Sequence, residues 1–323
     1  MKTFALLVYP ANIKQLKNFW PITRIMPGFL RQSWLKNNPP FKIVRIKEEI
    51  PGYLIALPLL PQQMLALGEE FILDKIVAAG HLAEELGASI LGLSGLNSLV
   101  LDKNNTMSKK LKIPVACGNA FTAWSVYEAI YRMAKAKKID LKKSTLAVIG
   151  ATNPTGSLCA RKLSGCVNKI ILSARERDKL ERLKENILHL NPIEIIIEED
   201  AHKAAREADI VVITAFEEAV NEFKPNAIVC DISISRNLKF DPNINFIQGG
   251  LIKLPYPSDL AKRMGLAKDI IYASMAETIL LASEERLVSN ALGESINLDR
   301  LEEIADIATQ HGFEVWVPEA PML

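Results

Sequence analysis

The segment Thr145-Leu-Ala-Val-Ile-Gly150-Ala-Thr-Asn-Pro-Thr-Gly156-Ser-Leu-Cys-Ala-Arg161 predicts a buried strand, a tight glycine turn and the first turns of a helix. Branched apolar residues fill the strand, and the two glycines permit the sharp turn and the close approach of the helix to the sheet. Backbone N–H groups at such a helix N-terminus usually face a dinucleotide pyrophosphate. The spacing is Gly-x-x-Asn-x-x-Gly instead of Gly-x-Gly-x-x-Gly, so a plain strand–helix connection stays open as an alternative. The candidate cofactor-binding residues are Gly150, Thr152, Asn153, Thr155 and Gly156.

Composition points to a globular protein without a strong charge bias. The chain has 323 residues, 49% of them apolar and 24% charged, which is enough for two domains with cores of their own. A formal net charge of +2 gives no electrostatic case for nucleic acid. The four cysteines form no Cys-x-x-Cys pair, which argues against a zinc site or a disulfide framework and favours a reducing cytoplasm. We expect no membrane span and no metal, because the apolar runs are short and ligand clusters are missing from the sequence.

Regular alternation of strands and helices dominates the second half. Strands are expected at 145–150, 169–174, 193–199, 209–215, 227–233 and 245–250, with helices at 156–164, 176–190 and 200–207. This alternation predicts βαβ units and a Rossmann-type parallel sheet over residues 141–273. Residues 1–118 are expected to form an α/β substrate domain of about four strands, with one long helix over 64–86, and residues 119–140 to form a connecting helix. The C-terminal helices, within 274–323, are expected to pack back on the first domain or on the connecting helix.

The ends of the predicted Rossmann strands give the remaining cofactor candidates. The second strand ends at Ser173 and Arg175, where an acid would favour the ribose 2′-hydroxyl of NAD and an arginine favours the 2′-phosphate of NADP. We therefore expect NADP, although Arg175 could also be a solvated residue before a helix. Small residues end the fourth and sixth strands and leave room for the nicotinamide and its ribose: Thr214, Ala215, Gly249 and Gly250.

Several stretches of the chain resemble the cyanobacterial long-chain acyl-acyl-carrier-protein reductases. The resemblance is carried by residues 117–123 (CGNAFTA), 147–152 (AVIGAT), 171–175 (ILSAR), 249–250, 273–281 (ASMAETILL) and 301–313. It implies NADPH-dependent reduction of an acyl thioester to a fatty aldehyde, with a small-molecule or acyl-carrier substrate and acyl carrier protein as a possible partner. More distantly, the layout is similar to shikimate dehydrogenase and glutamyl-tRNA reductase, which place substrate between an α/β domain and a Rossmann domain.

One position departs from the pattern of that family. Ser274 stands where the family has the cysteine that takes the acyl group, and a serine hydroxyl needs a neighbouring base to attack a thioester. Ser274 and Glu277 also have the spacing of a helix capping box, so a purely structural role is an alternative. Cys117, before a helix N-terminus that lowers a thiol pKa, is the candidate for a relocated nucleophile, or else a buried core residue. Asn119 and Thr122, at the start of the same helix, are the candidate substrate-binding residues.

The sequence therefore predicts a cytoplasmic, NADP-dependent oxidoreductase with its substrate between residues 117–122, 249–250 and 274. Acyl-thioester reduction is the first interpretation. Two alternatives remain: a dehydrogenase of a small polar metabolite that transfers hydride without a covalent step, and a non-catalytic NADP(H)-binding protein. The sequence leaves the oligomeric state open.

Overall fold

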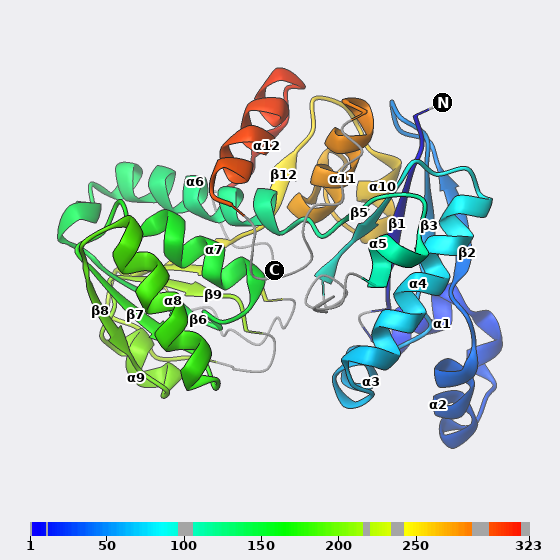
Figure 1. Ribbon diagram of the computed structural model, residues 1–323, viewed down its shortest axis with the longest axis horizontal. Coiled ribbons are helices and arrows are strands. Elements are labelled where there is room, and N and C mark those ends of the chain that lie inside the picture. The colour runs from blue at the N-terminus through cyan, green and yellow to red at the C-terminus, as the bar shows by residue number, and fades with distance from the viewer. Residues whose placement is uncertain are drawn as a thin grey trace. The chain divides into compact units, whose positions relative to one another are not determined.

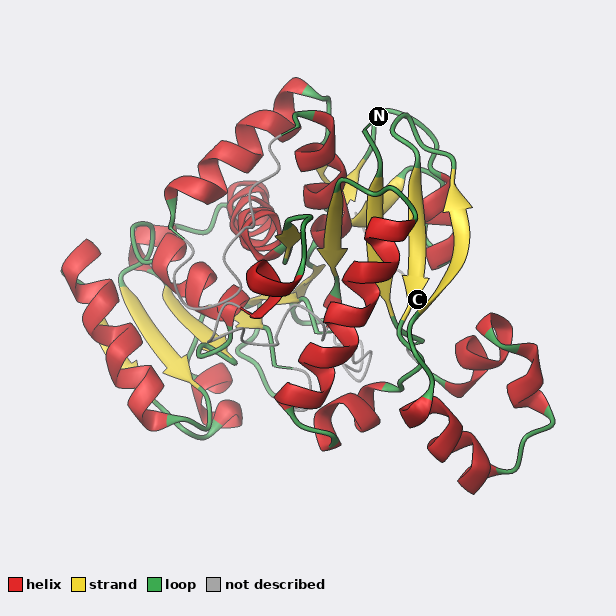
Figure 2. Ribbon diagram, turned by 45° about the vertical axis from the view of Figure 1, so that its right-hand side comes forward, coloured by secondary structure: helices red, strands yellow, loops and turns green. Residues whose placement is uncertain are grey.

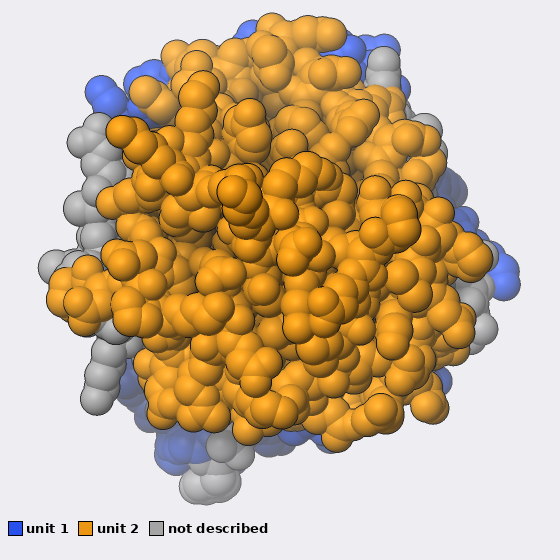
Figure 3. Space-filling view, turned by 90° about the vertical axis from the view of Figure 1, so that its left-hand side faces the viewer, with its two compact units in different colours: residues 1–118, 256–295 blue, residues 119–255, 296–323 orange. Residues whose placement is uncertain are grey.

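The computed structural model describes residues 2–10, 12–95, 106–215, 220–233, 242–285 and 297–317. The chain forms two compact units (Figure 3). Unit 1 contains residues 1–118 and 256–295, and unit 2 contains residues 119–255 and 296–323. No helix in the described part of the chain combines the length and the apolar composition needed to cross a bilayer.

The sheet of unit 1 has five strands in the order β2-β3-β1-β4-β5. All neighbouring pairs are parallel except β2 and β3, which are antiparallel. Because every residue of β1 is buried, this strand forms the middle of the core, as its continuous apolar sequence predicts. The strands are β1 (Phe4–Val8), β2 (Phe41–Ile46), β3 (Gly52–Ala56), β4 (Ile90–Leu93) and β5 (Val115–Ala116).

Several helices accompany this sheet along the chain (Figure 1). The single helix expected over 64–86 is in fact two, because Gly68 adopts a left-handed φ of 81° that breaks the helical path between them. The helices of unit 1 are α1 (Ile13–Phe19), the 3₁₀ helix η1 (Pro21–Arg24), α2 (Gly28–Asn37), α3 (Pro61–Ala66), α4 (Glu69–Glu85), α5 (Thr106–Lys110), α10 (Asp259–Met264) and α11 (Ala273–Ser283).

Helix α11 packs against β4 and β1, so the first C-terminal helix returns to the N-terminal sheet as expected. Gly92 in β4 makes this approach possible, because a Cβ at that position would collide with the Thr278 side chain of α11. Strand β13 (Ile270–Tyr272) and α10 precede α11 and belong to unit 1 as well. The compact units thus divide the chain at residue 255, whereas the sequence placed the boundary at 273.

Unit 2 is built around a six-stranded parallel sheet in the order β11-β10-β9-β6-β7-β8. Read from β8, this is the 3-2-1-4-5-6 order of dinucleotide-binding folds, which confirms the Rossmann-type sheet. Helices α7 (Pro154–Leu163), α8 (Arg177–Leu190) and α9 (Ala201–Arg206) connect successive strands. The strands are β6 (Thr145–Ile149), β7 (Lys169–Ser173), β8 (Glu194–Ile197), β9 (Ile210–Ile213), β10 (Ile228–Asp231) and β11 (Asn245–Gln248).

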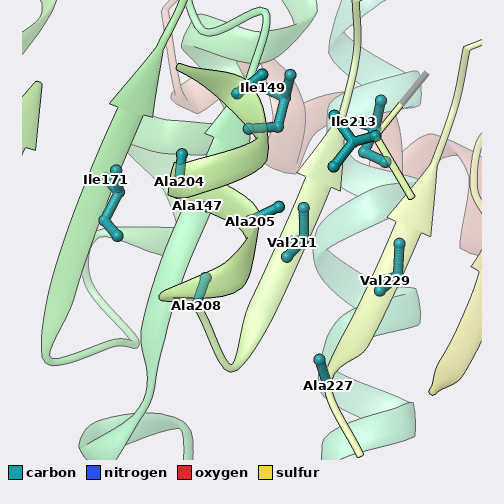
Figure 4. Close-up of a cluster of buried hydrophobic side chains, with 12 residues drawn as sticks. Ala147, Ile149, Ile171, Ala204, Ala205, Ala208, Val211, Ile213, Ala227 and Val229 are labelled. Atoms are coloured by element: carbon teal, nitrogen blue, oxygen red, sulfur yellow. The ribbon is translucent and has the colours of Figure 1, made fainter. Parts of the chain in front are cut away.

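Small residues on α9 allow it to lie close to this sheet. Figure 4 shows Ala204 and Ala205 of α9 facing the strands, among the branched side chains of Ile149, Val211 and Ile213. All five side chains are buried. Small side chains on the helix and branched ones on the strands are a combination that fills the space between the two layers.

The second C-terminal helix packs on the connecting helix, which is one of the two surfaces expected for it. Helix α12 (Asp299–Gln310) packs on α6 (Asn119–Lys137) within unit 2. Its amphipathic sequence buries Leu301, Ile304 and Ile307 on one face. The segment after it, β14 (Glu314–Val315), pairs antiparallel with β12 (Leu251–Lys253). These short strands carry too little sequence pattern to have been predicted.

Candidate functional site

The glycine turn after β6 has the geometry that its sequence predicts. Gly150 adopts a φ of 82°, and a Cβ at this residue would lie 2.7 Å from Thr214 Oγ1 and 2.8 Å from the Ala215 nitrogen. A Cβ at Gly156, in the third position of α7, would collide with the Gly150 carbonyl and lie 2.8 Å from the same Thr214 hydroxyl. Both positions therefore require glycine.

Asn153 and Thr214 tie this turn to the end of β9. Asn153 caps α7, because its Oδ1 accepts a hydrogen bond from the Gly156 N–H at 2.8 Å. Its Nδ2 donates to Thr214 Oγ1 at 2.8 Å, and the Thr214 hydroxyl in turn donates to the Ile149 carbonyl at 2.9 Å. Strand order reverses between β6 and β9, and this is where open α/β sheets bind their ligands. The predicted cofactor residues thus meet at the expected edge of the sheet.

The end of β7 presents an arginine and an acid side by side. Ser173 is buried, and its carbonyl accepts hydrogen bonds from the N–H groups of Gly150 and Ala151 at 2.8 and 3.1 Å. Arg175 is exposed in the turn that follows. Glu176, the residue after it, accepts hydrogen bonds from Thr152 Oγ1 and Lys179 Nζ, both at 2.8 Å. The ammonium of Lys179 and the hydroxyl of Thr152 hold the pKa of the Glu176 carboxyl below its usual value, so that it is ionised at neutral pH.

Glu176 is a further candidate residue that was not expected from the sequence. Its position directly after Arg175 was the available signal, since an acid after the second strand accepts a hydrogen bond from a ribose 2′-hydroxyl. Side chains of both kinds, one suited to NAD and one to NADP, therefore stand beside the glycine turn.

The start of α6 contacts the start of α7 through two buried polar side chains. Thr155 Oγ1 donates a hydrogen bond to Asn119 Oδ1 at 2.9 Å, and both residues are buried. Asn119 Nδ2 has no hydrogen-bond partner among the described residues although the side chain is only 2% exposed. A buried amide donor without a partner lowers the stability of the fold by about 1–3 kcal/mol, because it has lost its hydrogen bonds to water. A bound ligand with a hydrogen-bond acceptor would remove this penalty.

The turn after β11 completes this edge of unit 2. Gly250 adopts a φ of 74°, and its Cβ position is 3.6 Å from Thr122 Cγ2 on α6. The Gly249 N–H donates to the Asp231 carbonyl at 2.9 Å. Three of the predicted residues, Thr122, Gly249 and Gly250, are thus brought together.

Asp231 is a second residue that the sequence analysis did not select. It ends β10 and is 7% exposed, and its Oδ1 accepts a hydrogen bond from the Ser233 N–H at 2.7 Å. Burial raises the pKa of this carboxyl from 3.8 to about 6, against the opposing effect of the Ser233 hydrogen bonds. An acid closing an otherwise apolar strand was the sequence signal. A carboxyl that titrates near neutral pH at the ligand-binding edge is a candidate acid or base.

Unit 1 brings the two predicted catalytic residues into one place. Gly118, which follows Cys117, adopts a φ of 71°, and a Cβ there would collide with Ser274 and lie 2.9 Å from its carbonyl oxygen. Ser274 is partly exposed, whereas Cys117 is 1% exposed. The thiol is therefore a buried side chain, and Ser274 is the more accessible of the two.

The capping box expected at Ser274 is wrong. Helix α11 begins at Ala273 with Tyr272 as its N-cap, so Ser274 lies inside the first turn and its side chain does not cap the helix. Its carbonyl accepts a hydrogen bond from Thr278 Oγ1 at 3.3 Å. Glu277 is fully buried. Ser274 is thus not explained by a capping role.

Two further observations bear on the other candidate chemistries. No group of three or more histidine, cysteine, aspartate or glutamate side chains that could hold a metal ion occurs within the described ranges. Cys159 and Cys230 are completely buried, and burial raises the pKa of both thiols, that of Cys159 to about 12. Both are core residues of unit 2.

Known proteins similar to this chain include two sequence relatives, although no protein-family profile matches it. Aminotransferase PigE of Serratia sp. (strain ATCC 39006) is 25% identical over 317 residues, which cover 91% of this chain and 36% of PigE. The long-chain acyl-[acyl-carrier-protein] reductase of Synechococcus elongatus is 25% identical over 289 residues, which cover 82% of each chain. The chain spans little more than a third of PigE, so the activity of that whole protein does not transfer directly.

Solved structures give looser likenesses. L-tryptophan dehydrogenase from Nostoc punctiforme matches with a TM-score of 0.42 and 14% identity, over 97% of this chain and 84% of that one. Shikimate 5-dehydrogenase from Listeria monocytogenes, solved with shikimate and NAD, matches with a TM-score of 0.36 and 11% identity, over 94% and 96%. The fold assignment depends on the strand order of each unit and not on these scores.

Proposed function

We propose that this chain is an NADPH-dependent oxidoreductase that reduces the thioester carbonyl of a hydrophobic acyl group, carried on acyl carrier protein or coenzyme A, to an aldehyde. The observation that carries the proposal is the glycine turn at the reversal of strand order, where neither Gly150 nor Gly156 has room for a Cβ. The similarity to a long-chain acyl-acyl-carrier-protein reductase over 82% of the chain supports the substrate class.

The residues at this edge fit a nicotinamide dinucleotide. The turn from Gly150 to Gly156 would hold the pyrophosphate, and the exposed guanidinium of Arg175 would hold the 2′-phosphate of NADP. Thr214 and the Gly249–Gly250 turn would flank the nicotinamide end. NADPH supplies the hydride when it is bound. Asn119 Nδ2 would donate to the bound coenzyme or substrate, which satisfies its otherwise unpaired donor.

We expect NADP in preference to NAD because the negative charge of Glu176, which would repel a 2′-phosphate, is already balanced by Lys179. Its carboxylate is engaged by Thr152 and Lys179, and Arg175 remains exposed beside it. A 2′-phosphate would therefore meet Arg175, Arg177 and Lys179 in a stretch that also holds the acids Glu176 and Asp178. A ribose 2′-hydroxyl would instead have to displace one of the existing partners of Glu176.

A second candidate function follows from Ser274 and Cys117. Cys117, which precedes the glycine whose Cβ position meets Ser274, is buried, and a serine hydroxyl is a weak nucleophile without an adjacent base. Hydride transfer directly to a carbonyl, with Asp231 or another acid supplying the proton, needs no covalent acyl-enzyme. This chemistry is shared by dehydrogenases of small polar metabolites, and it is the alternative that the site supports.

The two functions separate in one experiment. The full chain is incubated with NADPH and long-chain acyl carrier protein or acyl coenzyme A, and in parallel with NADP⁺ and a panel of hydroxy acids. We expect NADPH oxidation and aldehyde formation with the acyl substrates only. Turnover with hydroxy acids alone would establish the second function. Coenzyme binding measured by fluorescence, with no turnover on either panel, would refute both and leave a non-catalytic NADP(H)-binding protein.

A further inference from the structure

Positive charge is concentrated at the beginning of the chain. Residues 1–47 contain nine lysines and arginines and no aspartate or glutamate. The whole chain has 39 basic and 37 acidic residues, so the other 276 residues hold 30 basic and 37 acidic ones. Residues 1–47 therefore carry a formal charge of +9, whereas the other 276 residues carry −7. A net charge of +2 hides this asymmetry, which is the electrostatic signature of an anionic partner.

The helices of this segment have a core of their own. Leu16, Trp20 and Leu35 of the α1–η1–α2 region are buried together with Ala56 of β3. The Trp20 ring meets Phe41 edge to face, with 4.5 Å between ring centroids. The apolar side chains that remain outside are thus left over after the helices have packed against the sheet.

Large aliphatic side chains nevertheless face outward here. Among the described residues, eight large hydrophobic side chains are exposed, and five of them come from α1, η1, α2 and α3 or the turns between them. These five are Ile13 (47% exposed), Ile22 (52%), Ile25 (81%), Leu30 (49%) and Leu65 (47%). Single exposed apolar residues are ordinary, but this concentration in one short region is not. Lys14, Arg24 and Lys36 are exposed among them.

Helices α1, α2 and α3 lie at the edge of the unit 1 sheet where strands β1 and β3 end (Figure 2). Helix α1 follows β1, and α3 follows β3, and the two strands are parallel. Strands β4 and β5 run in the same direction, so Cys117 and Gly118, which come after β5, stand at the same edge. The exposed aliphatic and basic side chains therefore share the edge of the sheet that carries Ser274 against Gly118.

We propose that residues 12–37, together with Leu65 of α3, dock reversibly on the surface of a lipid bilayer that contains anionic lipids. The aliphatic side chains enter the boundary between headgroups and acyl chains, and the basic side chains lie at the phosphates. This pairing of exposed aliphatic with basic groups selects a membrane surface. A nucleic-acid site would instead combine the basic groups with aromatic stacking platforms.

The test uses the full chain and sedimenting vesicles of phosphatidylcholine with or without phosphatidylglycerol. We expect binding to the anionic vesicles only, and weakening as the ionic strength rises from about 0.1 M to about 1 M, where the Debye length falls from ~10 to ~3 Å. The double variant Lys14→Gln/Arg24→Gln should bind about 25-fold more weakly, since each basic residue near such a surface contributes about fivefold. Ile22→Ser/Ile25→Ser should lose about tenfold or more.

Matched controls lie in unit 2. Lys135→Gln/Lys137→Gln removes two exposed charges from the end of α6, and Leu188→Ser/Leu190→Ser removes two exposed leucines (44% and 47%) from the end of α8. Both controls should bind like the wild type, and circular dichroism should show all variants folded. Equal binding to neutral vesicles, no vesicle binding, or equal losses in the controls would overturn the proposal. Preferential binding to duplex DNA over anionic vesicles would also overturn it. The same holds if the only effect of Ile22→Ser/Ile25→Ser is a change from dimer to monomer in light scattering.

Discussion

Asp231 should make the stability of this protein depend on pH in a way that one substitution removes. Its carboxyl titrates at about 6 in the folded chain instead of 3.8, because the end of β10 is buried. A carboxyl whose folded-state pKa is raised lowers stability once it ionises. This penalty is absent below about pH 3.8, grows as the pH rises, and is complete above the folded value of about 6. At 1.36 kcal/mol per pH unit, it amounts to about 3 kcal/mol at pH 8.

Asp231→Asn keeps an oxygen for the Ser233 N–H and cannot ionise. The measurement is the free energy of unfolding in urea for wild type and variant between about pH 4 and pH 8. Because the other groups titrate equally in both proteins, the difference between the two curves isolates Asp231. We expect Asp231→Asn to gain about 2.5 kcal/mol relative to wild type between the two ends of this range, because about 0.5 kcal/mol of the penalty is already present at pH 4. A difference that stays constant within about 0.5 kcal/mol, a common scale for neutral surface changes, would refute the reasoning.

Three other outcomes follow from the same geometry. Arg175→Ala should weaken NADPH binding by about 10- to 100-fold and leave NADH binding unchanged, whereas Glu176→Gln should strengthen NADPH binding a few fold. Coenzyme titration measures both effects. Equal losses of NADPH and NADH binding in Arg175→Ala would contradict the 2′-phosphate role. Gly118→Ala should lower the free energy of unfolding in urea by about 3 kcal/mol, because its φ of 71° and the contact with Ser274 both oppose a Cβ. The control Gly28→Ala should be nearly neutral, because nothing lies within 4 Å of a Cβ there. Similar losses of stability in both variants would contradict this prediction. Ser274→Cys should retain a labelled acyl group as a hydroxylamine-sensitive thioester, and absence of label on a folded variant would show that this position does not face the acyl carbonyl.

The sequence predicts strands and helices well where the pattern is long and periodic. The six strands of the parallel sheet in unit 2 and the glycine turn at Gly150 were all identified, because buried parallel strands are continuous apolar runs. The short strands β12 and β14 were not, because two or three residues carry no period. The break at Gly68 was missed because one glycine inside a helical pattern is compatible with a continuous helix.

For the candidate site, residue types were predictable and environments were not. Gly150, Asn153 and Thr214 meet because strand order brings the ends of β6 and β9 together. Asp231 escaped notice because its raised pKa comes from burial, which only the packed structure determines. Likewise, the interior position of Ser274 in α11 depends on where β13 ends, which the spacing to Glu277 does not reveal.

The chain passes between its two compact units at residues 118, 255 and 295, and this has a consequence for biosynthesis. The face of β4 and β1 stays uncovered until α11, about 180 residues later, has left the ribosome. A nascent or truncated product that stops before α11 would present that apolar surface to chaperones and proteases. Fragments 1–118 and 119–323, expressed separately, should therefore be insoluble alone and recover solubility only when produced together.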